Sequence, residues 1–565
     1  MAETTPDIEK TSPARAPNTD QPTAESSPSQ TLDVLEHDPG VKLALAREAY
    51  KAYGDLEDKP RRGEVLGWCL YEFCSYFIHT VLLPIVFPLI ISQAVADPHK
   101  LLTATAAALA DTRALAVSDM GFQCKHRQMQ LYQGLTNQTI GGSQLSLSPL
   151  EFTSVSWSLG LILAVPILAI LSRPLDRSPH HRLITLGSIA LGALCCLPVG
   201  FFQTTWIFPP YIAVIVAASI TASSGHTRHL SLMLRGYTAP TIHPDRFPLR
   251  STISGWLSLH SAAAGSVGAA LIAAFTYHML RNSEKFISLW IVCIFSGLIW
   301  AAGISHIFLG VSRGRSGAGG DFTFAPSLTS HIFDVFLRPY SAVNLCSVLF
   351  SSFSTACIFT AAVLHLVGQI CIKPLDLLFL WLTYFLFPLL SLPLSHPFQH
   401  FLKADAAKMQ ILGFLISAFT SGYAFFYRAA NWNKNHVLLF AGVQSTAAGL
   451  LHAFGRSLML DCAPIGKEWA HSMWHSWVRA VGMCAGFAMA SSAQGNISRP
   501  FGISFWVSVV GIVVVIFGNV SGLHGGLSAG NVNVEKEEEE PSLVRDFDAG
   551  EHEVDTRSGV HMEMP

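Results

Sequence analysis

Residues 65–93 read VLGWCLYEFCSYFIHTVLLPIVFPLIISQ, a stretch in which Glu72 is the single charged side chain. About 20 mostly apolar residues are enough for an α-helix to cross the hydrocarbon core of a bilayer. The stretch therefore predicts a transmembrane helix. The preceding residues, 1–62, are polar and lack the apolar core of a cleaved signal peptide, so we expect this helix to act as the targeting signal.

The composition of the whole chain supports a membrane protein. Of its 565 residues 50% are hydrophobic and 13% are charged, whereas a typical soluble domain has about 25% charged residues. Most of the surface is therefore expected to face lipid. The net charge of −2 argues against a nucleic-acid partner, which would favour a strongly basic face.

Eleven further apolar runs continue the pattern along the chain, and the fourth span is interrupted near its start by Pro209-Pro210. The sequence thus predicts an all-α polytopic membrane protein with twelve transmembrane helices. The further spans are expected at 151–172, 183–203, 206–224, 253–278, 286–309, 341–370, 376–395, 409–427, 436–454, 472–493 and 502–523.

Arginine and lysine are concentrated in alternate connections between these spans, which sets the expected orientation. The richer set is cytosolic by the positive-inside rule, and both termini are then cytosolic. The connection 94–150 is expected on the opposite side, where Asn137-Gln138-Thr139 would form a glycosylation acceptor.

The longest cytosolic connection divides the expected spans into six and six. Twelve helices in two six-helix halves is the plan of the major facilitator superfamily, in which substrate binds between the halves near the midplane and the halves rock. The predicted units are a disordered cytosolic tail at 1–62, an N-terminal half at 63–309, a linker at 310–340, a C-terminal half at 341–525 and a disordered acidic tail at 526–565.

The connection between spans two and three carries a candidate cytosolic gate. Facilitators have a Gly-x-x-x-Asp-Arg-x-Gly-Arg-Arg loop there, and this chain keeps Asp176-Arg177 and His181-Arg182 but not the glycines. We interpret Asp176, Arg177 and Arg182 as gating residues, because an Asp at a helix end can pair with an Arg of a neighbouring helix. The alternative is an ordinary basic turn.

Several short stretches of both halves carry a further pattern, at 64–73, 87–89, 151–153 leading to Asp176, 455–458 and 464–468. Together they resemble the vacuole-effluxer family of autophagy-related transporters. That family has Gly-Trp, Tyr-Asp/Glu-Phe and Phe-Pro-Leu in its first span, and Arg-Ser-Leu followed by Pro-x-Gly-x-Glu between spans ten and eleven. Cys74-Ser75 replaces the family's Ala-Asn.

The resemblance implies a secondary transporter that exports amino acids, mainly neutral ones, from a vacuole-like lumen to the cytosol. We expect a monomeric, multi-pass endomembrane protein that is not an enzyme and has a small-molecule substrate, the lipid bilayer and protons as partners. Gly466-Lys467 lacks the flanking residues of a phosphate-binding loop, and we expect no cofactor. The alternatives are a proton-coupled carrier of another solute, or a non-transporting scaffold or sensor.

Glu72 is the main candidate for proton or substrate coupling. A carboxylate at bilayer depth is costly, so Glu72 should face the bundle interior, and His79 lies seven residues later on the same helical face. The alternative is a buried structural contact.

Two sets of basic residues near the cytosolic side complete the candidates. Arg456, the fourth candidate gating residue, lies at the cytosolic end of span ten and should pair with an acidic group, of which Asp461 and Glu468 are nearest in sequence. The second set is His471, His475 and Arg479, spaced every four residues, which we place at the cytosolic end of span eleven without assigning them a metal.

Overall fold

The structure is a computed structural model that describes the membrane-embedded helices and parts of their connections. Several features expected from the sequence lie outside the described residues. They are Asn137, the side chains of Asp176 and Arg177, the expected linker apart from residues 335, 336, 339 and 340, and both expected tails apart from residues 59–62 of the first. The structure describes residues 59–95, 132–136, 140, 147–177, 181–201, 204–238, 249–282, 287–309, 335–336, 339–368, 373–402, 404–427, 434–463, 468–493, 496 and 498–518. At several of these positions, including 172–181, it describes the backbone without the side chain.

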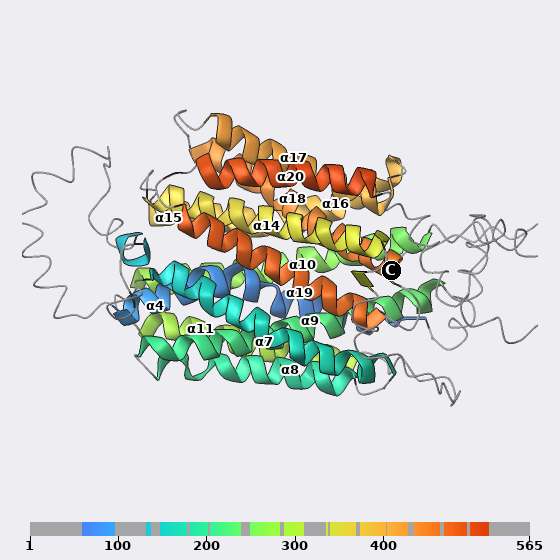
Figure 1. Cartoon of the computed structure of the whole chain (residues 1–565), viewed down its shortest axis with the longest axis horizontal. Helices are drawn as coiled ribbons and strands as arrows, with labels where there is room; N and C mark the ends of the chain where they lie inside the picture. The colour runs from blue at the N-terminus through green and yellow to red at the C-terminus, as the bar shows by residue number, and fades with distance from the viewer. Residues whose placement is uncertain are drawn as a thin grey trace, which may run out of the picture.

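The helices lie side by side in one elongated bundle (Figure 1). The first span comprises α3 (Arg62–Ser75), the π-helical segment η1 (Ile78–Val86) and α4 (Phe87–Val95). The other long helices are α7 (Pro149–Arg177), α8 (His181–Cys196), α9 (Phe208–Thr238), α10 (Leu249–Asn282), α11 (Ile287–Ala302), α14 (Pro339–Gly368), α15 (Pro374–Leu386), α16 (Pro388–Phe401), α17 (Ala406–Phe426), α18 (Lys434–Cys462), α19 (Glu468–Ser492) and α20 (Ser498–Phe517).

Ten helical stretches in the described part of the chain are long and apolar enough to cross a bilayer. The predicted all-α membrane class is therefore confirmed. Two of the twelve expected spans are not among the ten: α8, which has 16 residues, and α19, which has 25 residues but carries polar side chains along its first three turns. The count of twelve stays a prediction.

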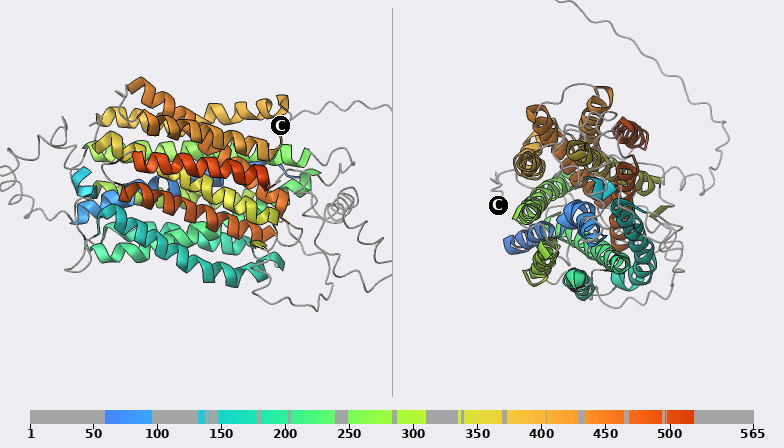
Figure 2. Two further views of the ribbon diagram at one scale, coloured as in Figure 1. Left: turned by 45° about the horizontal axis from the view of Figure 1, so that its top comes forward. Right: turned by 90° about the vertical axis from the view of Figure 1, so that its left-hand side faces the viewer.

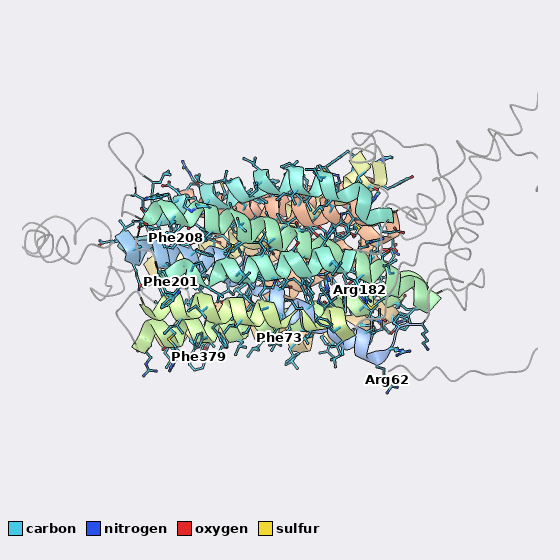
Figure 3. All side chains as sticks on the ribbon, turned by 90° about the horizontal axis from the view of Figure 1, so that it is seen from below. Arg62, Phe73, Arg182, Phe201, Phe208 and Phe379 are labelled. Carbon is cyan, nitrogen blue, oxygen red and sulfur yellow. The ribbon has the colours of Figure 1, made fainter. Side chains whose placement is uncertain are left out.

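The outward surface is that of a protein in lipid. Large apolar side chains such as Ile162, Leu194 and Leu390 are more than half exposed, which would be unfavourable for a contiguous surface in water. Figure 3 shows Arg62 and Arg182 at one end of the bundle and Phe201 and Phe208 at the opposite end. The basic residues that set the predicted orientation thus begin two helices at the same end.

Three expected features of the fourth and tenth spans change in the structure. Pro209 and Pro210 lie in the first turn of α9, where a proline removes no intrahelical hydrogen bond, so they begin the fourth helix rather than interrupt it. The helices α9 and α18 also run beyond residues 224 and 454, where we expected them to end. As a result Arg228 and Arg456 lie within helices and not in connections.

The helices before residue 310 pack largely on one another, as do those after residue 338, and the end-on view in Figure 2 places these two sets largely on opposite sides. The sets meet where α19 lies against α7 and α9, and where α10 lies against α15, α16 and α18. This contact zone positions the candidate site.

Small residues allow the close packing of α10 on the first span. A Cβ atom placed on Gly268 would lie 1.9 Å from the carbonyl oxygen of Phe73, and one on Gly265 would lie 3.0 Å from the Cγ of Glu72. Close helix approach through glycine is typical of membrane bundles. Gly265 and Gly268 therefore set how deeply the helix that carries Glu72 sits in the bundle.

Candidate substrate cavity and buried charge cluster

A cavity lies between the two sets of helices, about midway along the bundle. It has about 710 Å³ of space not occupied by atoms, part of it open to solvent. The first span and α7 contribute one wall, and α14, α15, α18 and α19 contribute the other. Its polar and aromatic lining includes Tyr76, His79, Thr80, Trp157, Ser351, Thr355, Phe359, Tyr384, His452, His475, Arg479 and Phe487.

Helical periodicity explains how α19 brings charge to the cavity. His475 and Arg479 are one turn apart on the same face, and that face is directed at the first span. The guanidinium carbon of Arg479 lies 5.8 Å from the ring centroid of Tyr76, which begins the break between α3 and η1. A cation over an aromatic face is a favourable contact.

On the opposite wall, His79 is held by a hydrogen bond and a ring contact. Its Nε2 atom lies 2.9 Å from the Ser219 hydroxyl of α9, and its ring stacks on Trp157 with centroids 5.7 Å apart. Trp157 in turn meets Phe487 at 6.0 Å. These contacts tie three helices of the first set to α19 at one aromatic layer.

A buried charge cluster lies next to the cavity, around Glu72. One Glu72 carboxylate oxygen, Oε1, is 2.6 Å from Arg456 Nη2 and 2.8 Å from His452 Nε2, and the other, Oε2, is 3.4 Å from His226 Nε2. All four side chains are buried. The carboxylate therefore faces groups from α9 and α18 rather than lipid.

Aromatic rings enclose this cluster. The ring of Trp68 stacks on that of His226 with centroids 4.7 Å apart and planes 9° apart, and the guanidinium carbon of Arg456 lies 5.4 Å from the Trp68 ring centroid. Trp68 donates its indole N–H to the carbonyl oxygen of His226. Trp68 and Glu72 of the first-span motifs thus form one packed unit with Arg456 of the later motif.

The cluster and the cavity share one residue, His452. Its ring lines the cavity, whereas its Nε2 atom lies 2.6 Å from Arg456 Nη2 as well as 2.8 Å from Glu72. A single imidazole nitrogen donates to the carboxylate when it carries a proton and accepts from the guanidinium when it does not, so it cannot make both hydrogen bonds at once. His452 therefore links the proton content of the cluster to the cavity wall.

A second, mostly apolar cavity adjoins the first and shares Pro84, Phe359 and Thr360 with it. It continues past Pro88 to Tyr132, which lies in the connection between the first two spans. Space in the described part of the bundle thus extends from the central cavity towards this connection. The charge cluster lies on the side that faces Arg62.

Glu72 and His79, which the sequence placed on one helical face, both contact α9, at His226 and at Ser219, two residues that are themselves seven positions apart. Glu72 pairs with Arg456 outside the cavity lining, while His79 lines the cavity. Residues seven positions apart lie two helical turns apart along the axis, so they have different neighbours on the same side of the helix. Both residues are buried in the bundle interior as expected.

The structure identifies the acidic partner of Arg456 but does not test the expected gate. Arg456 does pair with an acidic group, but that group is Glu72, not Asp461 or Glu468, because packing joins residues far apart in sequence. Arg182 begins the described side chains of α8, and Asp176 and Arg177 lie outside the described side chains, so gating by these three stays a prediction.

The placement of the α19 residues at a cytosolic helix end was wrong for two of the three. His471 lies in the first turn and contacts the hydroxyl of Ser341, with 3.2 Å between Nε2 and Oγ, but His475 and Arg479 lie further along and line the cavity. The described residues contain no group of three or more His, Cys, Asp or Glu side chains that could hold a metal ion.

Sequence reasoning missed His226 and His452, the two histidines of the cluster. His452 had a signal, since it lies four residues before Arg456 and so shares its helical face. His226 had none, because its place beside Glu72 depends on the packing of α9 on the first span.

Comparison with known proteins supports the class of fold. No protein-family model matches the chain, and no curated protein sequence matches it. Among solved structures, it is similar to the crystal structure of the human organic anion transporter MFSD10 (TETRAN), at 15% sequence identity and a TM-score of 0.52, covering 80% of this chain and 99% of that one. The chain therefore shares the overall fold of that solved structure, and its long apolar helices are those of a multi-pass membrane protein.

Proposed function

We propose that this protein is a secondary active transporter that binds a small solute in the central cavity and moves it by alternating access. One observation carries the proposal: buried polar side chains of both helix sets line a cavity midway along the bundle. Transporters of this fold bind substrate at that depth, between two halves that rock. A scaffold or sensor on the same fold needs no such cavity, and we would expect its centre to be apolar and fully packed.

The finer form of the proposal concerns architecture. We take α8 and α19 as spans, giving twelve helices in two halves, 63–309 and 341–525, joined by the cytosolic linker. The polar turns of α19 support this, because a helix lining a polar cavity need not be apolar all round. The Glu72–Arg456 pair joins the two sets of helices, which supports a cavity that is closed on the side of Arg62.

Direction and substrate follow from the resemblance in sequence. We propose export of small solutes, first among them neutral amino acids, from a vacuole-like lumen to the cytosol, with protons as the coupling ion. The cavity that continues towards the connection 94–150 supports loading from the side opposite the tails. A proton-coupled carrier of another small solute is the alternative within transport.

Uptake into proteoliposomes tests the proposal. The purified protein is reconstituted, and uptake of radiolabelled amino acids, organic acids, sugars and metal ions is measured with and without a pH gradient. We expect saturable uptake of at least one class, increased by the gradient. Absence of uptake for every class, with correctly folded protein in the vesicles, would favour the scaffold or sensor.

A matched pair of variants ties the uptake to the cavity. Ala356→Trp adds an indole to a residue of α14 that lines the cavity, and it should abolish uptake by filling the space. Leu439→Trp adds an indole to a side chain of α18 that is 65% exposed on the outer surface, and it should leave uptake unchanged. Equal uptake by both variants would show that solute does not pass through this cavity.

A further inference from the structure

The charged lining of the central cavity has one sign. Arg479 is the permanently charged side chain among the described lining residues, and no Asp or Glu is among them. Glu72 lies nearby but is not part of the lining, and Arg456 and His452 occupy its Oε1 atom. A solute in the cavity therefore meets a cation without meeting a carboxylate.

Within the described part of the chain, Arg479 has the ring of Tyr76 as its neighbour and pairs with no carboxylate. An arginine in a bundle interior normally pairs with an anion, because leaving its charge unpaired away from bulk water is costly. Its planar guanidinium can form two parallel hydrogen bonds to a carboxylate. The part of the cavity that Arg479 lines therefore suits a carboxylate brought by the solute.

Further polar atoms of the lining are also without partners. The Nδ1 atoms of His79, His452 and His475 are buried and have no hydrogen-bond partner among the described residues. If Ser219 donates to the Nε2 atom of His79, the ring proton of His79 is on Nδ1, which has no acceptor among the described residues. Buried polar atoms are normally satisfied, so these imidazoles add polar groups without a protein partner to the same cavity lining as Arg479.

The rest of the lining is aromatic and aliphatic. Trp157, Phe359, Tyr384 and Phe487 give flat apolar surfaces on both sides of the cavity. Such surfaces bind the apolar body of a solute, while a few placed polar groups fix its orientation. An ammonium group would be close to Arg479, a like charge, and would find no carboxylate in the lining.

We infer that the substrate class of this site is a small organic acid with an apolar or aromatic body and no amino group, whose carboxylate pairs with Arg479. The inference rests on the proposed transport function, keeps the small solute, and replaces neutral amino acids with organic acids as the preferred class. It makes the carboxylate the recognised group, so an amino acid would bind through its carboxylate and be penalised by its ammonium group.

Four probes with the same phenylalkyl body separate these contributions. They are 3-phenylpropionate, phenylalanine, 2-phenylethylamine and 3-phenylpropan-1-ol, and their binding to the purified full chain in nanodiscs is measured by calorimetry and thermal shift. We expect the acid to bind most tightly, phenylalanine more weakly, and the amine and the alcohol not to bind. Binding of the amine or alcohol as tight as that of the acid, tighter binding of phenylalanine, or no binding by the acid would overturn the inference.

Variants of Arg479 locate the acid. Arg479→Gln should weaken 3-phenylpropionate binding by about tenfold or more, since a charge-assisted pair is lost, and Arg479→Lys should retain part of the affinity. Arg499→Gln changes an exposed arginine at the start of α20 and should have no effect. Arg479→Lys preserves the charge but not the planar guanidinium. Loss of acid binding in both Arg479 variants, at unchanged thermal stability, would therefore still place the acid at this site. Unchanged affinity in Arg479→Gln would overturn the inference.

The transport assay distinguishes failure of the inference from failure of the proposed function. Saturable uptake of only sugars or amines would leave the transporter proposal in place and reject the organic acid. Binding of the acid that depends on Arg479, without uptake of any solute, would retain the site and reject transport.

Discussion

Glu72 of the first span and Arg456 of α18 form an ion pair that joins the two helix sets, with 2.6 Å between Oε1 and Nη2. The two residues are 384 positions apart in the chain and both are buried. A buried pair contributes little net stability in itself, but removal of one partner leaves an uncompensated charge. The pair is therefore suited to hold the helix sets together in one state and to be rearranged in another.

A double-mutant cycle tests this pairing. Glu72→Gln and Arg456→Gln should each destabilise the protein by about 3–5 kcal/mol, because each leaves one buried charge, and the double variant should lose less than the sum of the two. Melting temperatures in a mild detergent report the effect.

The exposed Arg499 provides the control for that cycle. Arg456→Ala should impair stability and transport more than Arg499→Ala does, since Arg499 lies at the start of α20 with its side chain exposed. Equal effects of the two alanine variants, or strictly additive losses in the cycle, would contradict a specific Glu72–Arg456 interaction.

Glu72→Gln also tests proton coupling. If Glu72 carries the coupled proton, Gln mimics its permanently protonated form: net flux driven by a pH gradient should fail, while exchange of substrate for substrate persists, because exchange does not require an empty, deprotonated carrier. If Glu72 only stabilises the fold, the protein level falls and the surviving fraction transports normally. Net flux, exchange and protein level are measured in the same vesicles, and normal net flux at a normal protein level would exclude a functional role.

The close packing of α10 on the first span makes Gly268 sensitive to a single methyl group. In Gly268→Ala the new Cβ atom would lie 1.9 Å from the Phe73 carbonyl oxygen, so the helices must separate, at a cost of about 1–3 kcal/mol. Gly187→Ala is the matched control, since a Cβ atom there has no neighbour within 4 Å and alanine favours the helix. Thermal unfolding of both variants should show a loss for Gly268→Ala and none for Gly187→Ala; the same melting temperature in both would contradict the close contact.

Asp176→Asn should slow transport while leaving the amount of protein in the membrane unchanged. The expectation comes from the Asp-Arg pair kept in a loop that otherwise departs from the facilitator pattern, and from its place at the end of α7. Initial rates of uptake, normalised to reconstituted protein, provide the measurement. Rates equal to those of the unmodified protein would leave the loop as an orientation signal only.

The predicted orientation is tested with tags at both termini and in the connection 94–150. Protease added to intact vesicles of known sidedness should remove the two terminal tags from the cytosolic face and spare the internal one. This follows from the concentration of arginine and lysine in alternate connections. Protection of the N-terminal tag would reverse the assigned orientation.

The sequence by itself determined the class of this protein, because the spacing and length of apolar runs reflect the thickness of a bilayer and need no knowledge of packing. It also indicated that Glu72 faces the interior, since a carboxylate is too costly in lipid. It could place Arg456 on a helix face but not name its partner. Its nearest acidic neighbours in sequence, Asp461 and Glu468, were the wrong choice.

Only the tertiary structure decided which side chains meet. The packing of α9 and α18 on the first span brings His226, His452 and Arg456 to one carboxylate, and it places His79, two turns further along the same span, in the cavity wall. The role assigned to Arg479 changed for the same reason. In sequence it continues a four-residue repeat of basic residues, but in the folded bundle it is the cation of a cavity lined by two sets of helices, because the face of a helix acquires a role only when its neighbours are in place.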